Sequence, residues 1–593
     1  MKRSLCRLAP LFIATSLVFS NLAGPFYESA VVRAQTPRQL PTRIQASDTP
    51  ADITIPDIIN GDTVEIGDFN GDRISDFLVG YKDFVQGLGG FAFVKFGIFF
   101  GKRNQSTPVN IRITKDNPDL ILNINPGSIE SIRKFGDLND DQVDDLLITE
   151  RASDGTGAAG RVFKIIFGGP RIQSGVTDSS ALPADLTVIS DRRSDAFSQS
   201  VESAADINGD GAKDLILVES TAGFGTSISV LPGPFASGET IDLTSRSPQI
   251  VIKANNSKSY VDVLPPADIN GDGNADILVG GYENDDNTGF SPYLVYVVFG
   301  SPGLISGAPI SLSDGQANAT IVVGFDLGGI MTGDINGDGL DDILIGHAYQ
   351  DSEAPPPPWL SGSSSINLGS RTMQGRVDRS DVFVLGLDSP RPDFLFPRGG
   401  FGDRLGASIA LGDIDGDGRT DIIIGAPGKT IDGKDRSQSL ERAYVLLGPA
   451  EVKSISTQKD QQDLTISFDT VSGDVGSRVD SGDFNGDGIS DIVVGGVFAV
   501  YVFFGAPLRP PEITKAKYRS STSDVIIFGT DFTGSARVEI NGVVVDREVS
   551  FDPDTNKLVL HAERSELNLL DGKNQIAVIR KGSRSNAVKL KLQ

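Results

Sequence analysis

The sequence predicts an all-β protein, in which a seven-bladed β-propeller is followed by a small β-sandwich. Three observations predict this fold: a nine-residue pattern that occurs seven times, an apolar run after each copy, and a change of composition near residue 510. Glycine (68 residues) and proline (32) are also frequent. Many short apolar runs separated by such residues are typical of short strands joined by tight turns.

Residues 1–34 predict a signal peptide. Lys2, Arg3 and Arg7 form a positive start, and the apolar stretch Leu8–Phe19 is shorter than the roughly 18 residues of a membrane span. Cleavage after Ala23 and cleavage after Ala34 both fit, and a retained anchor is the alternative. We expect an exported protein, secreted or at the cell surface, with a linker over 35–47 and no membrane span in the mature chain. The one cysteine, Cys6, lies in this segment, so we expect no disulfide.

The repeated pattern is D-x-[ND]-x-D-x-x-x-D, and its copies are 62 to 79 residues apart. We number them loops 1 to 7; they begin at Asp68, Asp137, Asp206, Asp268, Asp334, Asp413 and Asp483. Each is followed by an apolar run, and a second apolar segment then ends in a turn such as Phe100-Gly101. Seven such repeats predict a propeller over 48–507, since solenoid repeats are shorter, at about 20–50 residues.

The fifth repeat is the longest. We assign 350–379, which includes Pro355–Pro358 and Trp359, to an insertion outside the blades, because a proline run cannot join a sheet. The second apolar segment of this repeat is then expected at Asp381–Leu387. The insertion is either an inert linker or a ligand-contacting loop with Trp359 as its apolar anchor.

Each loop predicts a calcium site. Side chains at positions 1, 3, 5 and 9 and the main-chain carbonyl at position 7 provide the oxygen ligands that a hard cation prefers, and glycine at position 4 or 6 allows the tight turn. Position 12 is apolar, so the loop enters a strand and is not a helical EF-hand. The predicted ligands of up to seven Ca²⁺ ions are Asp68, Asn70, Asp72, Ile74, Asp76, Asp137, Asn139, Asp141, Val143, Asp145, Asp206, Asn208, Asp210, Ala212, Asp214, Asp268, Asn270, Asp272, Asn274, Asp276, Asp334, Asn336, Asp338, Leu340, Asp342, Asp413, Asp415, Asp417, Arg419, Asp421, Asp483, Asn485, Asp487, Ile489 and Asp491.

These loops account for much of the acidity of the chain. Six hold three carboxylates and loop 6 holds four, which makes 22 of the 78 acidic residues in a chain of net charge −25. Magnesium and manganese remain alternatives, whereas zinc is disfavoured because the chain has only two histidines. Nucleic acid is a poor partner for so acidic a protein. Loop 2 matches the pattern least well, because Asp140 and Gln142 replace both glycines, and we expect it to bind less tightly.

At these loops the sequence resembles the FG-GAP repeat family, which forms the propeller of integrin α-subunit heads. The fullest match is Phe401–Pro427, FGDRLGASIALGDIDGDGRTDIIIGAP. The resemblance implies a seven-bladed propeller with calcium on one rim, and a role in adhesion. All seven repeats carry the loop here, whereas only some blades of integrin heads carry it.

The composition changes over 508–593, where lysine and arginine become frequent and the metal loops stop. Alternating segments at Asp524–Phe528, Ala536–Ile540, Lys557–Leu560 and Gln575–Arg580 predict a small β-sandwich. The segments PPEITKAKY, GTDF and SRSNAVKL resemble an IPT/TIG immunoglobulin-like domain.

No nucleophile motif accompanies His347 or His561, so we expect a non-enzymatic protein. The preferred function is an exported module that binds an extracellular protein or polysaccharide. A structural component of the cell envelope or matrix is the first alternative. A calcium-dependent enzyme acting on polysaccharide is the second, since aspartates are plentiful.

Overall fold

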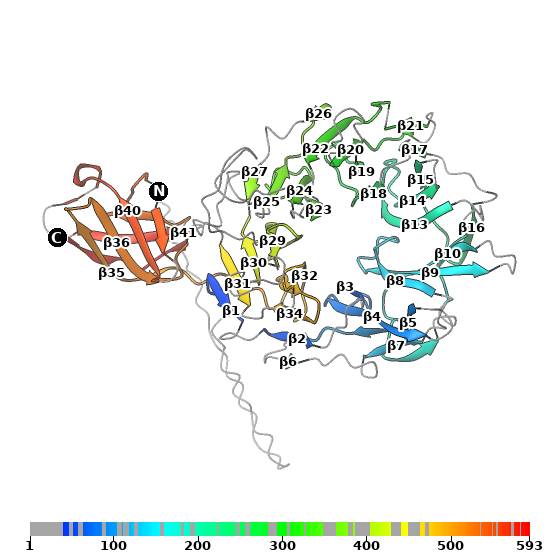
Figure 1. Ribbon diagram of the computed structural model, residues 1–593, viewed down its shortest axis with the longest axis horizontal. Coiled ribbons are helices and arrows are strands. Elements are labelled where there is room, and N and C mark those ends of the chain that lie inside the picture. Colours follow the sequence, from blue (N-terminus) through cyan, green and yellow to red (C-terminus); the bar gives the residue numbers. More distant parts are fainter. Residues whose placement is uncertain are drawn as a thin grey trace, which may run out of the picture. The chain divides into compact units, whose positions relative to one another are not determined.

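The computed structural model describes most of the chain after residue 38 (Figure 1). The described residues are 39–592 except 47–50, 57–62, 86–89, 104–108, 111–117, 124–128, 154–158, 179–182, 190–195, 222–224, 244, 246–249, 255–260, 283–292, 305–308, 313, 325–327, 348–362, 378–382, 386–403, 428–440, 449–462, 469–473, 534, 548, 553–554, 568, 571–573 and 581–582. The signal-peptide prediction therefore lies outside the described residues, as does Trp359.

Seven sheets form a β-propeller, as predicted, with the first strand of each blade nearest the common axis (Figure 1). From inside to outside, blade 1 consists of β3 (Thr63–Gly67), β4 (Asp76–Val85), β5 (Gly90–Phe99), β7 (Leu120–Asn123) and β11 (Gly175–Asp178). Blade 2 consists of β8 (Ile129–Gly136), β9 (Asp145–Ser153), β10 (Ala159–Ile166), β12 (Leu186–Ile189) and β16 (Glu239–Asp242). Blade 3 consists of β13 (Ala196–Ala205), β14 (Asp214–Thr221), β15 (Gly225–Leu231), β17 (Ile250–Ala254) and β21 (Ile310–Ser311).

Blades 4 to 7 follow the same order. Blade 4 consists of β18 (Val261–Val263), β19 (Ile277–Tyr282), β20 (Tyr293–Val298), β22 (Ala319–Gly324) and β26 (Gly375–Val377), and blade 5 of β23 (Gly329–Gly333), β24 (Asp342–His347), β25 (Ser363–Asn367) and β27 (Phe383–Leu385). Blade 6 consists of β28 (Ser408–Gly412), β29 (Asp421–Ala426), β30 (Glu441–Leu446), β31 (Leu464–Phe468) and β1 (Arg43–Gln45). Blade 7 consists of β32 (Arg478–Gly482), β33 (Asp491–Gly495), β34 (Ala499–Phe503), β2 (Ile53–Pro56) and β6 (Val109–Asn110).

The N-terminal segment closes the ring. β2 pairs antiparallel with β34 as the fourth strand of blade 7, and β1 pairs parallel with β31 at the outer edge of blade 6. The assignment of 35–47 to a linker was therefore wrong for residues 43–45. The short segment Arg43–Gln45 lacks a strand pattern of its own, and its place in a sheet depends on a partner more than 400 residues away.

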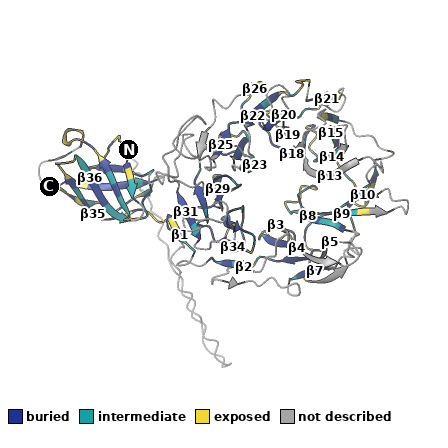
Figure 2. Cartoon of the chain, in the orientation of Figure 1, coloured by how far each residue is buried: buried dark blue, intermediate teal, exposed yellow. Residues whose placement is uncertain are grey.

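Apolar residues on both faces of the inner strands form cores between adjacent blades. One such core joins Phe69, Leu78 and Phe96 of blade 1 to Ile132 and Ile148 of blade 2, all buried. Similar clusters occupy other blade junctions, and the buried strands are evident in Figure 2. This packing fixes the start of each second strand, and therefore the end of each metal loop.

The fifth repeat differs from its prediction. β25, Ser363–Asn367, pairs with β24 as the third strand of blade 5, and β27 is the fourth strand. The prediction of a third strand at Asp381–Leu387, with 363–367 in the insertion, is therefore wrong. The sequence SSSIN has one β-branched residue, Ile366, and no aromatic residue, so its pairing was not evident.

Residues 512–592 form a separate set of strands around their own apolar core, which includes Ile527, Phe532 and Val578. The strands are β35 (Glu512–Arg519), β36 (Asp524–Thr530), β37 (Arg537–Ile540), β38 (Val543–Val544), β39 (Val549–Asp552), β40 (Lys557–His561), β41 (Gln575–Arg580), β42 (Ser583–Arg584) and β43 (Val588–Leu592), with a 3₁₀ turn, η5 (Arg564–Glu566). The four strand segments predicted here are confirmed. Among the described residues, no helix has the length and apolar character needed to cross a membrane.

Candidate metal centres

All seven loops occupy the same place in their blades, between the first and second strands. The loops of neighbouring blades also touch. At five junctions the N–H of position 8 donates to the carbonyl of position 1 in the preceding blade; these pairs are Ser75 to Asp483, Asp144 to Asp68, Ala275 to Asp206, Asp341 to Asp268 and Ser490 to Asp413, at 2.7–3.1 Å. The loops therefore form a belt along one rim of the propeller.

The acidic side chains fold each loop back on itself. In loop 1 the Asp68 carboxylate accepts the N–H groups of Gly71, Asp72 and Arg73 at 2.8–3.2 Å. The Asp72 carboxylate accepts the N–H of Ile74 at 2.9 Å. The position 5 to position 7 bond occurs in every loop. These bonds turn the oxygens of positions 1, 3 and 5 toward the inside of the turn.

The ninth-position aspartate connects its loop to the third strand of the blade. In loop 6, Asp421 accepts the N–H of Ile414 at 2.7 Å with one oxygen and the N–H of Gly448 at 2.7 Å with the other. The same two bonds, to position 2 and to the glycine that ends the third strand, occur in all seven blades. We predicted this residue as a ligand, but the sequence did not reveal its second role.

All seven ninth-position aspartates are fully buried. Burial, together with the other carboxylates of the same loop, raises their pKa values despite the backbone hydrogen bonds. The pKa rises to about 8 for Asp76 and Asp491, to about 7 for Asp145, Asp276 and Asp421, and to about 6 for Asp214 and Asp342. A bound cation would offset this cost of holding a buried negative charge.

The donor set fits a hard cation most clearly in loop 6. Carboxylate oxygens of Asp413, Asp415 and Asp421 lie within 4.8 Å of one another. Oxygens this close repel unless a proton or a cation lies among them. In the other loops an asparagine replaces Asp415, and its amide reaches the acidic partners, as when Asn208 donates to Asp214 at 3.0 Å. The arrangement can coordinate a cation.

Glycine at position 4 of loops 3 and 4 is favoured for two reasons. Gly209 has φ +74°, and a Cβ built on it would lie 2.1 Å from the Asn274 side chain of the next loop. Gly271 shows the same close approach to Leu340, at 2.1 Å. The position 7 side chain of one loop therefore packs over the turn of the preceding loop, a contact that sequence spacing alone does not predict.

Loop 2 departs from this pattern. Asp140 and Gln142 adopt φ of 60° and 67°, which glycine adopts more readily. The neighbouring position 7 residue is Ala212, which leaves room for the Asp140 side chain. The Lys213 ammonium lies 2.9 Å from Asp140 and 3.5 Å from Asp137. Burial alone would lower the pKa of Lys213, but its contacts with Asp140 and Asp137 raise it overall.

A second set of repeated polar residues was missed. Asp119 precedes the fourth strand of blade 1 and accepts the N–H of Phe100 at 3.0 Å, at the end of the third strand. Residues in the same place in blades 2, 4, 6 and 7 do the same; they are Asp185, Asn318, Asp463 and Asp52. The recurring sequence D-[LI]-x-[IVL], as in DLIL, DLTV and DITI, was the signal that could have found them.

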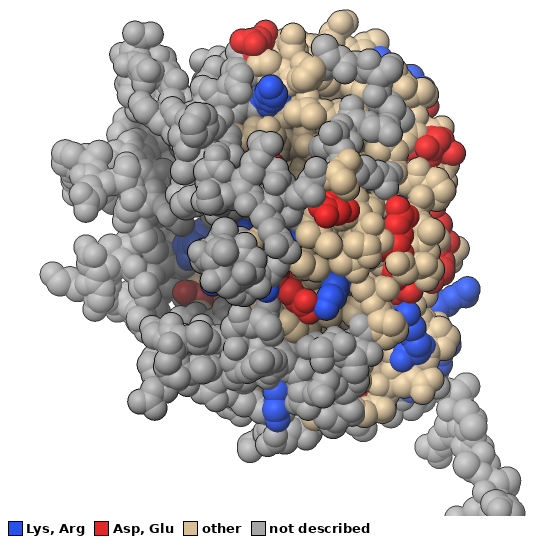
Figure 3. Space-filling model, turned by 90° about the vertical axis from the view of Figure 1, so that its right-hand side faces the viewer, with Lys and Arg blue, Asp and Glu red and all other residues tan. Residues whose placement is uncertain are grey.

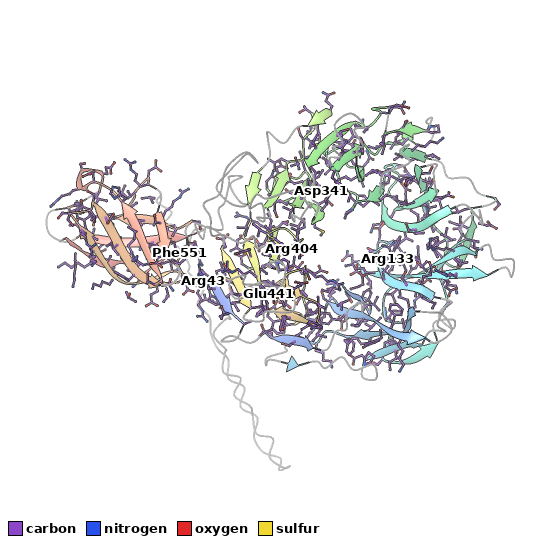
Figure 4. All side chains as sticks on the ribbon, in the orientation of Figure 1. Arg43, Arg133, Asp341, Arg404, Glu441 and Phe551 are labelled. Atoms are coloured by element: carbon purple, nitrogen blue, oxygen red, sulfur yellow. The ribbon has the colours of Figure 1, made fainter. Side chains whose placement is uncertain are left out.

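Charged residues of both signs gather on the innermost strands of blades 7, 1 and 2. Burial raises the pKa of Glu65 on β3, with Arg133 opposing the shift and Asp480 adding to it. Figure 4 shows Arg133 on the inner side of its blade. On the face turned to the viewer in Figure 3, acidic and basic side chains are interspersed among neutral ones, so the described part of this face offers no uniformly basic surface for nucleic acid.

Comparison with known proteins supports an integrin-like propeller. The FG-GAP repeat model matches residues 405–446, which contain loop 6. Integrin alpha-PS2 of Drosophila melanogaster is 28% identical over 253 residues, covering 38% of this chain and 16% of that protein. Integrin alpha pat-2 of Caenorhabditis elegans is 26% identical over 226 residues, covering 36% and 17%.

An enzyme is also among the relatives. Phosphatidylinositol-glycan-specific phospholipase D of Rattus norvegicus is 28% identical over 181 residues, covering 29% of this chain and 19% of that protein. The chain thus spans less than a fifth of the length of each of these relatives. The matched FG-GAP repeat at 405–446 lies in the propeller, and the chain is similar to integrin α-subunits over 38% and 36% of its length in the two cases above.

Proposed function

We propose that this chain is an exported calcium-binding β-propeller that acts as a non-catalytic binding module for an extracellular protein or polysaccharide. One observation carries the calcium part of this proposal: the same nine-residue loop recurs at the same place in all seven blades, with its ninth aspartate fully buried. Seven buried carboxylates of raised pKa, each beside two or more further acidic groups, are more readily explained by cations than by turn formation alone.

Calcium would have a structural role here. Positions 1, 3, 5, 7 and 9 would hold the ion, and the ninth aspartate would transmit its binding to the second and third strands. Because cations bind folded loops and not the unfolded chain, calcium would stabilise the propeller by mass action. Magnesium prefers fewer protein oxygens and stricter geometry, so calcium fits a loop with five protein ligands better.

The binding role rests on similarity to integrin α-subunits together with the architecture. A rigid propeller presents loops on two faces, and such loops are where binding residues usually lie. We further propose that residues 512–592 form an IPT/TIG-like β-sandwich. The strands pair in the continuous order β38–β37–β41–β43–β35–β36–β40–β39 around one apolar core, which supports a sheet folded over into two layers.

Binding is tested with the purified chain on arrays of extracellular-matrix proteins and polysaccharides, with calcium or with chelator. We expect calcium-dependent retention of at least one class without any change in its chain length. Release of soluble oligosaccharide, or hydrolysis of a glycosylphosphatidylinositol anchor, would instead support the enzyme alternative that the phospholipase D similarity raises. Retention by neither class, with envelope association on cell fractionation, would support a structural component.

A further inference from the structure

Position 8 lies against the preceding loop at six of the seven junctions, and its identity varies around the ring. Asp144 and Asp341 use their carboxylates to accept the N–H of Asp68 and Asp268, at 3.0 and 2.9 Å. Figure 4 shows Asp341 beside the strands of blade 5. Position 8 is thus a contact through which one blade acts on the cation loop of its neighbour.

Lys213 is the one lysine at position 8. Its ammonium donates to the main-chain carbonyl of Asp137, lies 3.5 Å from the Asp137 carboxylate and forms an ion pair of 2.9 Å with Asp140. Asp137 is the first ligand position of loop 2. A fixed positive charge from blade 3 therefore lies against the acidic group that would begin the coordination of a cation in blade 2.

The neighbouring residues match this arrangement. Asp140 stands where the other six loops have glycine, and Ala212 is the smallest of the residues at position 7. Where a larger position 7 residue occurs, as with Asn274 or Leu340, it lies so close to the glycine of the preceding loop that a Cβ built there would be 2.1 Å from it. The junction of blades 2 and 3 therefore differs from the others in a matched way. An ion pair between Asp140 and Lys213, with the small Ala212 beside it, replaces the packing of a larger side chain over a glycine.

We propose that Lys213 makes loop 2 the weakest calcium site of the ring, so that loop 2 fills last and empties first. This inference rests on the proposed calcium function. An ammonium within several ångströms of a divalent ion repels it, which corresponds to a roughly tenfold loss of affinity at a solvated site. The lack of glycine is a separate cause, and the two are distinguished by substitution.

The test is calcium titration of the full chain by isothermal calorimetry and flow dialysis. We expect six tight sites and a seventh that is weaker by about tenfold or more. Asp141→Asn should abolish only the weak site, whereas the matched change Asp210→Asn in loop 3 should remove a tight one. Lys213→Met should tighten the seventh site about tenfold, and Lys253→Met, which changes a lysine on β17 of the same blade, should leave it unchanged.

Each other outcome is informative. Loss of a tight site in Asp141→Asn would overturn the inference while leaving the calcium function intact. A weak site that Lys213→Met leaves unchanged but Asp140→Gly tightens would assign the weakness to backbone strain, and would also overturn the inference. No calcium bound by the unaltered chain would refute the proposed calcium function itself. Far-UV circular dichroism of each variant shows whether the propeller is folded.

Discussion

Asp421 is both a proposed calcium ligand and the acceptor of two buried backbone N–H groups, and two substitutions separate these roles. Asp421→Ala leaves the N–H groups of Ile414 and Gly448 without their acceptor. Each unsatisfied buried N–H costs about 1–3 kcal/mol, and without a cation the substitution also removes part of the cost of the buried carboxylate, so we expect the free energy of unfolding to fall by roughly 2 kcal/mol in chelator. Asp417 is exposed, accepts the N–H of Arg419 and forms an exposed ion pair of 3.8 Å with the same residue, so Asp417→Ala should cost less than about 1 kcal/mol in chelator.

In chelator the Asp417→Ala variant should be nearly as stable as the unaltered chain, but in calcium it should be clearly less stable. At a calcium concentration of about one hundred times the dissociation constant, each occupied site adds about 2.7 kcal/mol to the free energy of unfolding. Both variants should lose that amount for loop 6. The measurement is urea unfolding followed by circular dichroism, with calcium and with chelator. Equal stability of the two variants in chelator would refute the connecting role of the ninth aspartate.

Three further predictions follow from the packing and the charges. Gly209→Ala should lower the melting temperature by several degrees more than Gly337→Ala, because both glycines have φ near +75° but only Gly209 would meet a neighbouring side chain; equal losses would show that the blade contact is unimportant. Because the folded-state pKa of Glu65 is raised above its ordinary value, Glu65 contributes to a loss of stability as pH rises above that value, in addition to the seven buried aspartates. Glu65→Gln should reduce this loss without removing it, in melting temperatures measured from pH 4 to 8; parallel profiles would contradict it. A chain that begins at residue 57 lacks β1 and β2 and should lose its cooperative unfolding transition, whereas one that begins at Gln39 should keep it; equal transitions would contradict closure of the ring by these strands.

The repeat made the propeller predictable. Seven identically placed loops, each followed by an apolar strand, required only local pattern and spacing, and the seven sheets confirm the prediction. The errors occurred where pairing is not local. β1 depends on β31, and β25 has a serine-rich sequence that the surrounding blade forces into a strand.

The chemistry of the loops was only partly visible in the sequence. The ligand positions were predicted from alternation, and their assignment remains a prediction. The contacts of Lys213 with Asp137, and of Asn274 with Gly209, join residues 65 or more positions apart, so no spacing rule reveals them. The hydrogen bonds that Asp421 accepts from Ile414 and Gly448 were not predicted, because the spacing of the ligand pattern gives no information on the end of the third strand.

The most direct test of the calcium-bound propeller is the metal content of the purified chain, with thermal unfolding before and after chelation. Saturating calcium should give seven ions per chain, six of them retained at low calcium, and chelation should lower the melting temperature by many degrees. Little bound calcium, together with a melting temperature that chelator does not change, would contradict the calcium assignment and leave the seven loops as turns.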